Sequence, residues 1–359
     1  MEIEKKLKKF WSGKRIFITG HTGFKGSWLS IILNQLGSKL YGYSLKPEKK
    51  SLFNQSRISK NFNTNTYGDI NNISLLQKKI SLAKPEIIFH LAAQPLVLEG
   101  YKNPINTFKT NIMGTVNLLY SIRSIKSIKS VVIITTDKVY KINKKNKPYN
   151  EFDQLGGYDP YSTSKVGAEL VTSCFIQSYY GHSRLNNRIS TARAGNVIGG
   201  GDYSKNRLVP DIIKTLNNKN KIYIRNPNHI RPWQHVLEPI MGYLTLAQKQ
   251  YEGVNKDQNN CWNFGPNKNN FKKVLDIVKK IQNLKHFKYS FRKTKNVKET
   301  EILKLNSDKS KKMLKWSPLW NLDYTLKMIL DWNTMINKGY SAKEVCKKQF
   351  LMYINKYKK

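Results

Sequence analysis

Cysteine and long apolar runs are both scarce in this sequence. The three cysteines, Cys174, Cys261 and Cys346, are an odd number at wide spacing. This pattern excludes a disulfide framework and a C-x-x-C metal knuckle, so we expect reduced thiols and no bound metal. No segment approaches the ~20 apolar residues that a membrane-spanning helix needs, and no apolar stretch follows the charged residues 1–11 before the first strand. We therefore expect a soluble, cytoplasmic protein with no membrane partner.

Acidic residues are also few: 23 Asp and Glu stand against 63 Lys and Arg, giving a formal net charge of +40. Taken alone, this excess favours nucleic acid, an anionic membrane surface or an acidic substrate as a partner. Lys, Asn and Ile are all abundant, however, as a coding sequence rich in A and T would produce, and no known nucleic-acid-binding motif accompanies the lysines. We expect no nucleic-acid partner, although the charge suits the attraction of a diphosphate.

Strand-like and helix-like segments alternate along the first half of the chain. Apolar or β-branched runs at 14–20, 39–45, 86–94 and 130–140 predict strands, and helical patterns lie between them. This alternation predicts an α/β fold with a doubly wound parallel sheet of the Rossmann type. The second half has shorter helices and loops rich in Gly, Asn and Pro, which predicts a smaller, closely packed substrate-facing lobe.

A glycine motif follows the first predicted strand directly. In TGHTGFKG, Gly20, Gly23 and Gly26 lie three residues apart, and an apolar helical pattern begins at once after them. The first glycine permits a tight turn, the second lets the backbone approach a pyrophosphate, and the third lets the helix pack on the strand. The positive end of that helix favours phosphate. The motif in this context predicts a dinucleotide site.

Two further patterns carry acid and base groups. Tyr161 and Lys165 form Y-x-x-x-K, so both lie on one face of a predicted helix. A free tyrosine, with a pKa of ~10, is a poor base at neutral pH, but a nearby ammonium and a cationic nicotinamide would lower that pKa. Thr136, Asp137 and Lys138 end a predicted buried strand, where α/β sheets present their chemistry. We therefore expect these five side chains to form the catalytic site.

The G-x-x-G-x-x-G spacing and the Y-x-x-x-K pair together resemble the extended short-chain dehydrogenase/reductase family. The resemblance implies NAD as cofactor, with Tyr161 and Lys165 among its contacts. The second predicted strand nevertheless ends without the usual acidic residue and is followed by Lys46, so this pattern alone leaves NAD and NADP open. The other positions that match cofactor contacts of the family are Gly20, Thr22, Gly23, Phe24, Gly26, Asp69, Ile70, Leu91, Ala92, Ala93 and Asn111.

The segment T-T-D-K at 135–138 is similar to the sugar-nucleotide 4,6-dehydratases of that family. They carry Thr-Asp-Glu, in which the Asp is the acid toward the leaving hydroxyl and the Glu is the base at carbon 5. The resemblance gives Thr136 a hydrogen bond to the 4-oxygen and Asp137 the role of acid. Lys138 in place of the Glu is a feature of the CDP-glucose branch, and it would act as a base if its pKa is lowered or otherwise as a cation that stabilises an enolate.

Matches continue through RAGNVIGGGDYSKNRLVPD at 193–211 and RPWQHV at 231–236. They imply CDP-glucose as substrate, bound by Gln94, Asn196, Arg207 and Arg231, with a bidentate contact from Arg231 to the diphosphate. A dehydratase for dTDP- or GDP-sugars, a 4-epimerase and a non-catalytic, nucleic-acid-binding dinucleotide sensor are the alternatives. The first two dehydratases would carry Glu at 138, the epimerase has no need of Asp137 and Lys138, and the sensor would need none of the catalytic groups.

The resemblance covers residues 10–335 and implies how the chain is divided. Residues 1–190 would form mainly an NAD-binding domain. Residues 191–335 would form mainly a sugar-nucleotide-binding lobe, with one strand that returns to the first sheet. Residues 336–359 would be a lysine-rich tail or helix. Members of the family commonly pair helices in a homodimer, which would include the helix of Tyr161.

Overall fold

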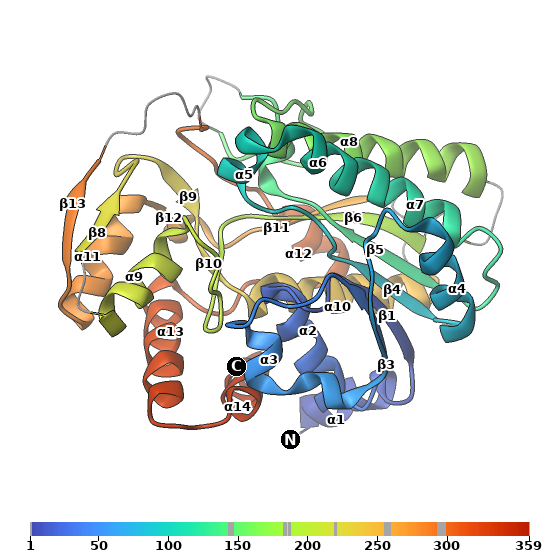
Figure 1. Cartoon of the computed structure of the whole chain (residues 1–359), viewed down its shortest axis with the longest axis horizontal. Coiled ribbons are helices and arrows are strands. Elements are labelled where there is room, and N and C mark those ends of the chain that lie inside the picture. The colour runs from blue at the N-terminus through green and yellow to red at the C-terminus, as the bar shows by residue number, and fades with distance from the viewer. Residues whose placement is uncertain are drawn as a thin grey trace.

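Seven parallel strands form the central sheet of the computed structural model, in the order β11-β6-β5-β4-β1-β2-β3 (Figure 1). This order reverses direction beside β1, as in doubly wound folds, so the predicted Rossmann-type fold is confirmed. The strands are β1 (Arg15–Thr19), β2 (Lys39–Ser44), β3 (Phe62–Tyr67), β4 (Ile87–His90), β5 (Ser130–Ile134), β6 (Ile189–Ala194) and β11 (Cys261–Phe264). The structure describes residues 2–142, 147–181, 185, 188–218, 221–254, 260–292 and 299–358.

Helices cover both faces of this sheet (Figure 1). Because adjacent side chains of a strand point to opposite faces, Ile16 and Ile18 of β1 join one core and Phe17 joins the other. The core of Ile16 and Ile18 is shared with α1 (Glu2–Trp11), α2 (Phe24–Gln35), α3 (Leu52–Ser56), α10 (Leu237–Tyr251), α12 (Asp308–Leu314) and α14 (Ala342–Ile354). The core of Phe17 is shared with α4 (Ile73–Ala83), α7 (Gly114–Ser121) and α8 (Pro160–Phe175).

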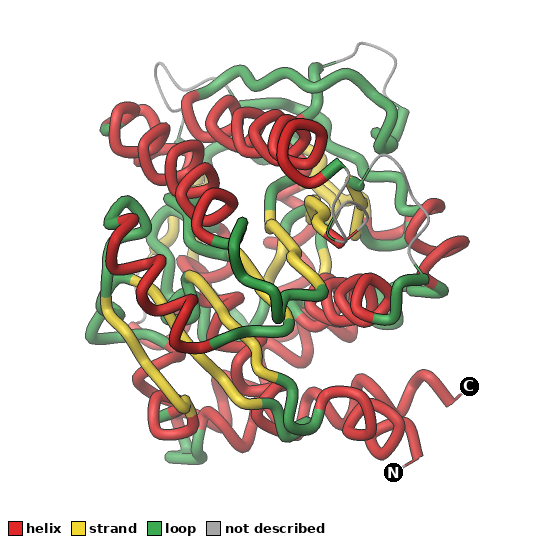
Figure 2. Tube along the Cα trace, turned by 90° about the vertical axis from the view of Figure 1, so that its right-hand side faces the viewer, coloured by secondary structure: helices red, strands yellow, loops and turns green. Residues whose placement is uncertain are grey.

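A smaller lobe lies beside the carboxyl ends of the strands, at the left of Figure 1. Figure 2 views the molecule from the side opposite this lobe and shows helices on both sides of the strands. Its strands form short pairs: β8 (Lys221–Ile224) with β13 (Lys288–Phe291), β9 (Ile230–Pro232) with β12 (Phe271–Lys273), and β7 (Val197–Ile198) with β10 (Gln234–His235). Its helices α9 (Leu208–Asn218), α11 (Val274–Leu284) and α13 (Leu322–Asn337) share a separate apolar core with β8. The lobe forms one wall of a cavity whose other wall is the end of the large sheet.

The chain beyond residue 190 contributes to both parts. β11 pairs with β6 at the edge of the large sheet, and α10, α12 and α14 pack on that sheet as well. The predicted returning strand and terminal helix are therefore both present, while the proposed limits at 190 and 335 stay predictions.

Two local details differ from the sequence prediction. The strand predicted over 130–140 ends at Ile134, because Thr136 caps a short 3-10 turn, η3 (Asp137–Val139), by accepting a hydrogen bond from the Lys138 amide at 3.4 Å. Strand β3 was not predicted, since its sequence FNTNTY is polar and the strand lies at the sheet edge, where one side is solvated. The 3-10 turn has a functional consequence, because it directs successive side chains into one cavity.

Candidate active site

A first cavity of ≈480 Å³ lies at the carboxyl ends of β1, β2 and β4. Gly20 makes the turn above it with φ +73°, and a Cβ at this position would lie 2.5 Å from the Ala92 amide nitrogen. A Cβ at Gly26 would lie 2.2 Å from the Gly20 carbonyl oxygen, so α2 can pack here only with glycine. Ten predicted cofactor residues line the cavity: Gly20, Thr22, Gly23, Phe24, Gly26, Asp69, Ile70, Leu91, Ala92 and Ala93.

Local hydrogen bonds shape the far end of this cavity. The exposed Asp69 carboxylate accepts from the Asn71 amide at 2.8 Å, and its carbonyl accepts from the Tyr43 hydroxyl. Lys46 lines the cavity from an exposed position. Glu48 also lines this cavity. It was not predicted, because the sequence analysis considered only an acidic residue directly at the end of β2.

Asn111 and Gln94 organise the loop after β4. The Asn111 side chain accepts from the Gln94 amide at 2.8 Å and donates to Ser164 on α8 at 2.8 Å. The Gln94 side chain donates to Thr107 and accepts from the Leu96 amide, so both ends of its amide have protein partners. Neither residue is among the described residues that line the two cavities. Their predicted contacts with substrate and cofactor stay predictions, and in this structure both side chains hydrogen-bond to the loop and its neighbours.

A second cavity of ≈310 Å³ lies between the large sheet and the smaller lobe. Thr136, Asp137, Lys138 and Tyr161 line it from the large sheet. Asn196, Arg207 and Arg231 line it as well, from chain segments after β6. The residues that line both cavities are Phe24, Lys25, Pro95, Asp202 and Arg207. The two cavities therefore meet, and a group bound in one can reach a group bound in the other.

Tyr161 lies in the first turn of α8, which begins with a capping box. Asp159 accepts from the Ser162 amide at 3.0 Å, and Pro160 occupies the first helical position. Burial raises the pKa of Tyr161 to about 12, while a hydrogen bond with Thr136 and the charge of Arg207 oppose this shift. In the protein alone, burial outweighs these two opposing effects, and the predicted lowering by an ammonium together with a cationic nicotinamide stays a prediction.

Lys165 lies one turn further along α8. Its ammonium donates to the Ile134 carbonyl at 3.0 Å, and burial lowers its pKa to about 8. The carboxylate of Glu169, on the next turn, opposes that shift. Lys165 is thus tied to the end of β5, and it is not among the described residues that line either cavity.

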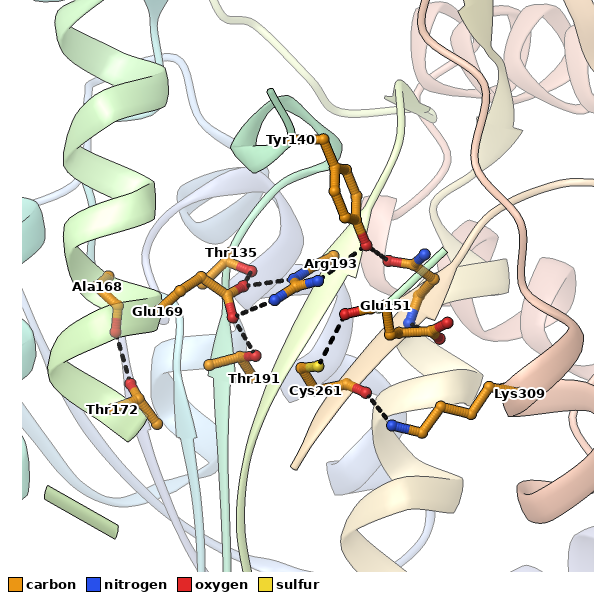
Figure 3. A network of polar contacts seen from close by, with 11 residues as sticks. Thr135, Tyr140, Glu151, Ala168, Glu169, Thr172, Thr191, Arg193, Cys261 and Lys309 are labelled. Atoms are coloured by element: carbon orange, nitrogen blue, oxygen red, sulfur yellow. Dashed lines mark hydrogen bonds and ion pairs between the residues drawn. The ribbon is translucent and has the colours of Figure 1, made fainter. Parts of the chain in front are cut away.

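A buried network of polar contacts lies between α8 and the neighbouring strands (Figure 3). Glu169 accepts from Thr135 and Thr191 and forms an ion pair with Arg193 at 2.9 Å, in which both side chains are 4% exposed. Arg193 also donates to the Tyr140 hydroxyl at 2.9 Å. The network joins α8 to β6 and to the loop after β5. Breaking one partner of such a buried pair costs about 3–5 kcal/mol, so it holds the catalytic elements in fixed register.

Asp137 and Lys138 are adjacent in η3, and both face the substrate cavity. Asp137 is 3% exposed; its Oδ1 accepts from Thr136 at 3.1 Å, and its Oδ2 has no hydrogen-bond partner within the described ranges. Burial raises the pKa of this carboxyl. The pKa of Lys138 is lowered by burial and by the charge of Arg231. Burial thus shifts the pKa of each group in the direction that favours its neutral form.

The two predicted arginines differ in how exposed they are and in the partners that they already bind. Arg207 is 34% exposed; among the described residues its one ion pair is with Asp202 at 3.3 Å, and it also donates to the Pro95 carbonyl at 3.4 Å. Arg231 is buried; one terminal nitrogen donates to the carbonyls of Ile230 and Glu301, and the other donates to His229. A bidentate contact from Arg231 to a diphosphate would require these partners to be released, so Arg207 is the better placed of the two for phosphate.

Sequence reasoning also missed Lys25 and Glu299. Lys25, the lysine of TGHTGFKG, lies where the two cavities meet, and burial with the charges of Lys165 and Arg207 lowers its pKa to about 7. Glu299 enters the substrate cavity from a segment far from the other residues in the chain. The position of Lys25 inside the glycine motif could have identified it from the sequence, whereas no local sequence pattern marks Glu299.

Within the described part of the chain, no helix has the length and hydrophobicity to span a bilayer. Nor do three or more His, Cys, Asp or Glu side chains gather there as metal ligands would.

Similarity to known proteins agrees with this site. Residues 17–329 match the family model described as GDP-mannose 4,6 dehydratase. The chain is 42% identical to CDP-glucose 4,6-dehydratase of Salmonella typhimurium, over 97% of this chain and 98% of the relative. It is 29% identical to dTDP-D-glucose 4,6-dehydratase of Dictyostelium discoideum, over 76% and 62%.

Solved structures share the fold at lower identity. A dTDP-glucose 4,6-dehydratase from Bacillus anthracis, in complex with NAD, has a TM-score of 0.75 at 21% identity and covers 91% of this chain and 99% of its own. A UDP-glucose 4-epimerase from Thermotoga maritima, with UDP-glucose, has a TM-score of 0.73 at 21% identity and covers 88% and 97%. With the family model matched over most of its length and a relative at 42% identity, the chain belongs to the GDP-mannose 4,6 dehydratase family, a sugar-nucleotide dehydratase branch of the extended short-chain dehydrogenases/reductases.

Proposed function

We propose that this protein is an NAD-dependent CDP-glucose 4,6-dehydratase, which converts CDP-glucose to CDP-4-keto-6-deoxyglucose and water. One observation carries the proposal: Asp137 and Lys138 face the same cavity as Tyr161, and burial shifts the pKa of each toward its neutral form. A 4-epimerase moves one proton at a hydroxyl and has no use for this additional acid and base. The 42% identical relative named a CDP-glucose 4,6-dehydratase supports the choice of nucleotide.

The first cavity suits NAD. Its floor at Gly20 and Gly23 is backbone without side chains, as a pyrophosphate requires, and the start of α2 directs amide groups toward it. When bound, NAD supplies the hydride acceptor for carbon 4 and the hydride donor for carbon 6, so the reaction has no net redox change. Lys25 and Arg207, at the junction of the cavities, would hold the phosphates of cofactor and substrate.

Side chains of the protein would carry out the proton transfers. Tyr161, as phenolate, takes the proton of the 4-hydroxyl, and Thr136 donates a hydrogen bond to the 4-oxygen. Lys138, or a base that it organises, takes the proton of carbon 5, which the 4-keto group has made acidic. Asp137 gives its proton to the departing 6-hydroxyl, which leaves as water. Asn196 and Arg207 would bind the nucleotide and its phosphates, because both line the same cavity.

A homodimer is also part of the proposal. Exposed apolar side chains gather on the outer helical layer of α6 (Pro104–Phe108), α7 and α8, where Ile105 is 80% exposed and Leu170 is 57% exposed. Pairing of this layer with its copy would cover them. Leu170→Glu should then shift the protein to the monomer in sedimentation, whereas Leu284→Glu, on an unrelated exposed helix end, should not. A cytoplasmic location accompanies the proposal, because nucleotide sugars and NAD are made there.

The direct test is turnover of a panel of sugar nucleotides. Purified protein would be incubated at neutral pH with NAD and CDP-glucose, dTDP-glucose, UDP-glucose or GDP-mannose, and the 4-keto-6-deoxy product followed by its absorbance in alkali. We expect turnover of CDP-glucose that Tyr161→Phe reduces by about 10³-fold. A product from another nucleotide would keep the chemistry and change the substrate. A carbon 4 epimer without dehydration would contradict the roles of Asp137 and Lys138.

A further inference from the structure

The loop after β2 brings charged residues of both signs to the wall of the first cavity. β2 pairs with β1, and the Gly20 amide donates to the Tyr43 carbonyl at 2.9 Å, so this loop begins beside the glycine turn. A dinucleotide with its pyrophosphate at that turn has its adenosine ribose at the end of the second strand. Lys46, Glu48 and Lys50 line the cavity from this loop.

The last residue of β2 is uncharged. Ser44 stands where enzymes of this fold usually carry the carboxylate that accepts from the ribose hydroxyls of NAD. Its hydroxyl lies 2.7 Å from that of Thr22, which in turn donates to the Leu45 carbonyl at 3.0 Å. Because the Thr22 proton is used in that bond, Ser44 donates its own proton to Thr22. A charged acceptor for the ribose would therefore come from another residue of the cavity.

Three carboxylates line the cavity among the described residues, and two of them already have partners. Asp69 accepts from the amide and the side chain of Asn71. Asp202 forms its ion pair with Arg207. The third, Glu48, is exposed, and within the described ranges its carboxylate has no hydrogen bond or ion pair. Glu48 is thus the carboxylate of this cavity that is available to a ligand.

Hydrogen bonds hold the loop that carries Glu48. The Asn54 side chain donates to the Glu48 carbonyl at 3.0 Å, and Ser51 caps α3 by accepting from the Asn54 amide at 3.3 Å. The ammonium of Lys50 lies over the ring of Tyr203, 5.1 Å from its centroid. The backbone of Glu48 is therefore fixed at the cavity wall, whereas its side chain is not used to hold the loop.

We propose that Glu48 binds the adenosine ribose of NAD and selects NAD over NADP, with its carboxylate accepting hydrogen bonds from the ribose hydroxyls. The inference rests on the proposed function, in which NAD occupies the first cavity. A carboxylate accepts from both hydroxyls of a ribose, whereas it repels the 2′-phosphate of NADP. Lys46 acts in the opposite direction, since an ammonium favours that phosphate.

The test measures the affinity for NAD and for NADP by calorimetry, without a sugar nucleotide, so that it does not depend on turnover. Glu48→Gln keeps the size of the side chain and removes its charge. NAD should bind this variant about tenfold more weakly, because hydrogen bonds to a charged acceptor are lost, while NADP should bind at least as tightly as to the wild type. Glu252→Gln makes the same change of charge at the exposed end of α10, outside the cavity, and should change neither affinity.

A second measurement tests the contact itself, with an NAD analogue whose adenosine ribose lacks the 2′-hydroxyl. The wild type should bind this analogue more weakly than NAD, whereas Glu48→Ala should bind the two equally, because the acceptor of that hydroxyl is gone. An unchanged NAD affinity in Glu48→Gln, or an equal loss with the analogue in wild type and Glu48→Ala, would overturn this inference and leave the proposed function intact. A wild-type protein that binds neither dinucleotide would overturn the proposed function, and this inference with it.

Discussion

At the scale of single residues, burial shifts the pKa of the titratable side chains of the site. Asp137 and Lys138 are neighbours in the chain, and a simple ion pair between them is the obvious alternative. The 3-10 turn instead places both in one cavity, where burial raises the pKa of the carboxyl and lowers that of the amine. The unpartnered Oδ2 of Asp137 is where a leaving hydroxyl could be protonated.

Asp137→Asn should separate oxidation from elimination. The amide keeps the size and the hydrogen bond with Thr136 but has no acidic proton to give. We expect oxidation at carbon 4 to continue, so that reduced cofactor accumulates at 340 nm, while formation of the 4-keto-6-deoxy product falls by about 10²-fold or more. An unchanged rate of product formation in this variant would show that another group protonates the leaving hydroxyl.

At the scale of elements, the turn between β1 and α2 depends on glycine for two separable reasons. Gly20 has φ +73°, which favours glycine, and it lies against the backbone of the loop after β4. Gly13, before β1, has the same φ of +73° but has no atom within 4 Å of the site of a Cβ. Substitutions at Gly13 and Gly20 therefore separate the effect of backbone strain from the effect of a close contact with neighbouring backbone.

Gly13→Ala should cost only the strain, about 1 kcal/mol in the free energy of unfolding, and leave NAD affinity unchanged. Gly20→Ala adds a clash with the Ala92 amide at 2.5 Å, so the loop that lines the cofactor cavity must move. We expect NAD to bind at least about tenfold more weakly to this variant, measured by calorimetry, because the loop it displaces forms the cavity wall. Equal NAD affinities in the two variants would contradict this account of the glycine motif.

The sequence predicts an element well when the pattern that identifies it lies within a short stretch of chain. β1, the glycine turn and α2 were predicted because strand, turn and helix follow one another within 14–36. The polar edge strand β3 and the early end of β5 depend on sheet position and on one capping threonine, which apolar patterns do not show.

The same limit applies to the site. Glu299 reaches the substrate cavity only through the pairing of its segment with β9, which joins distant parts of the chain. Conversely, Gln94 and Asn111 fall inside motifs that predicted ligand contacts, yet their side chains are used to hold the loop. Motif position identifies the neighbourhood of the site, and hydrogen bonding then decides which side chains are free to act.

At the scale of the whole molecule, one buried carboxyl joins the terminal helix to the body of the protein. Glu238 of α10 is 1% exposed and accepts from the amides of Leu319 and Trp320 and from the hydroxyl of Tyr353 on α14. Burial raises the pKa of Glu238 to about 7 from a usual value of 4.5. The chain after α12 is thus attached to the sheet layer through a group that titrates in the physiological range.

This pKa predicts a specific dependence of stability on pH. Below about 4.5 the folded and unfolded chains both hold the proton, so its binding favours neither state. Between about 4.5 and about 7 the unfolded chain releases the proton while the folded chain keeps it, so stability falls as pH rises. Above about 7 both states are ionised and the loss, of the order of 3 kcal/mol in total, no longer grows.

Glu238→Gln cannot titrate, and its amide oxygen can still accept the two backbone hydrogen bonds. The Tm of the wild-type protein minus that of Glu238→Gln should therefore decrease steadily from pH 4.5 to pH 7 and be constant above it, whatever other groups do, because those groups are common to both proteins. Glu252→Gln, at the exposed end of the same helix, should give a flat difference over this range. Parallel melting curves for wild type and Glu238→Gln would mean that Glu238 is ionised throughout, with its hydrogen bonds outweighing its burial.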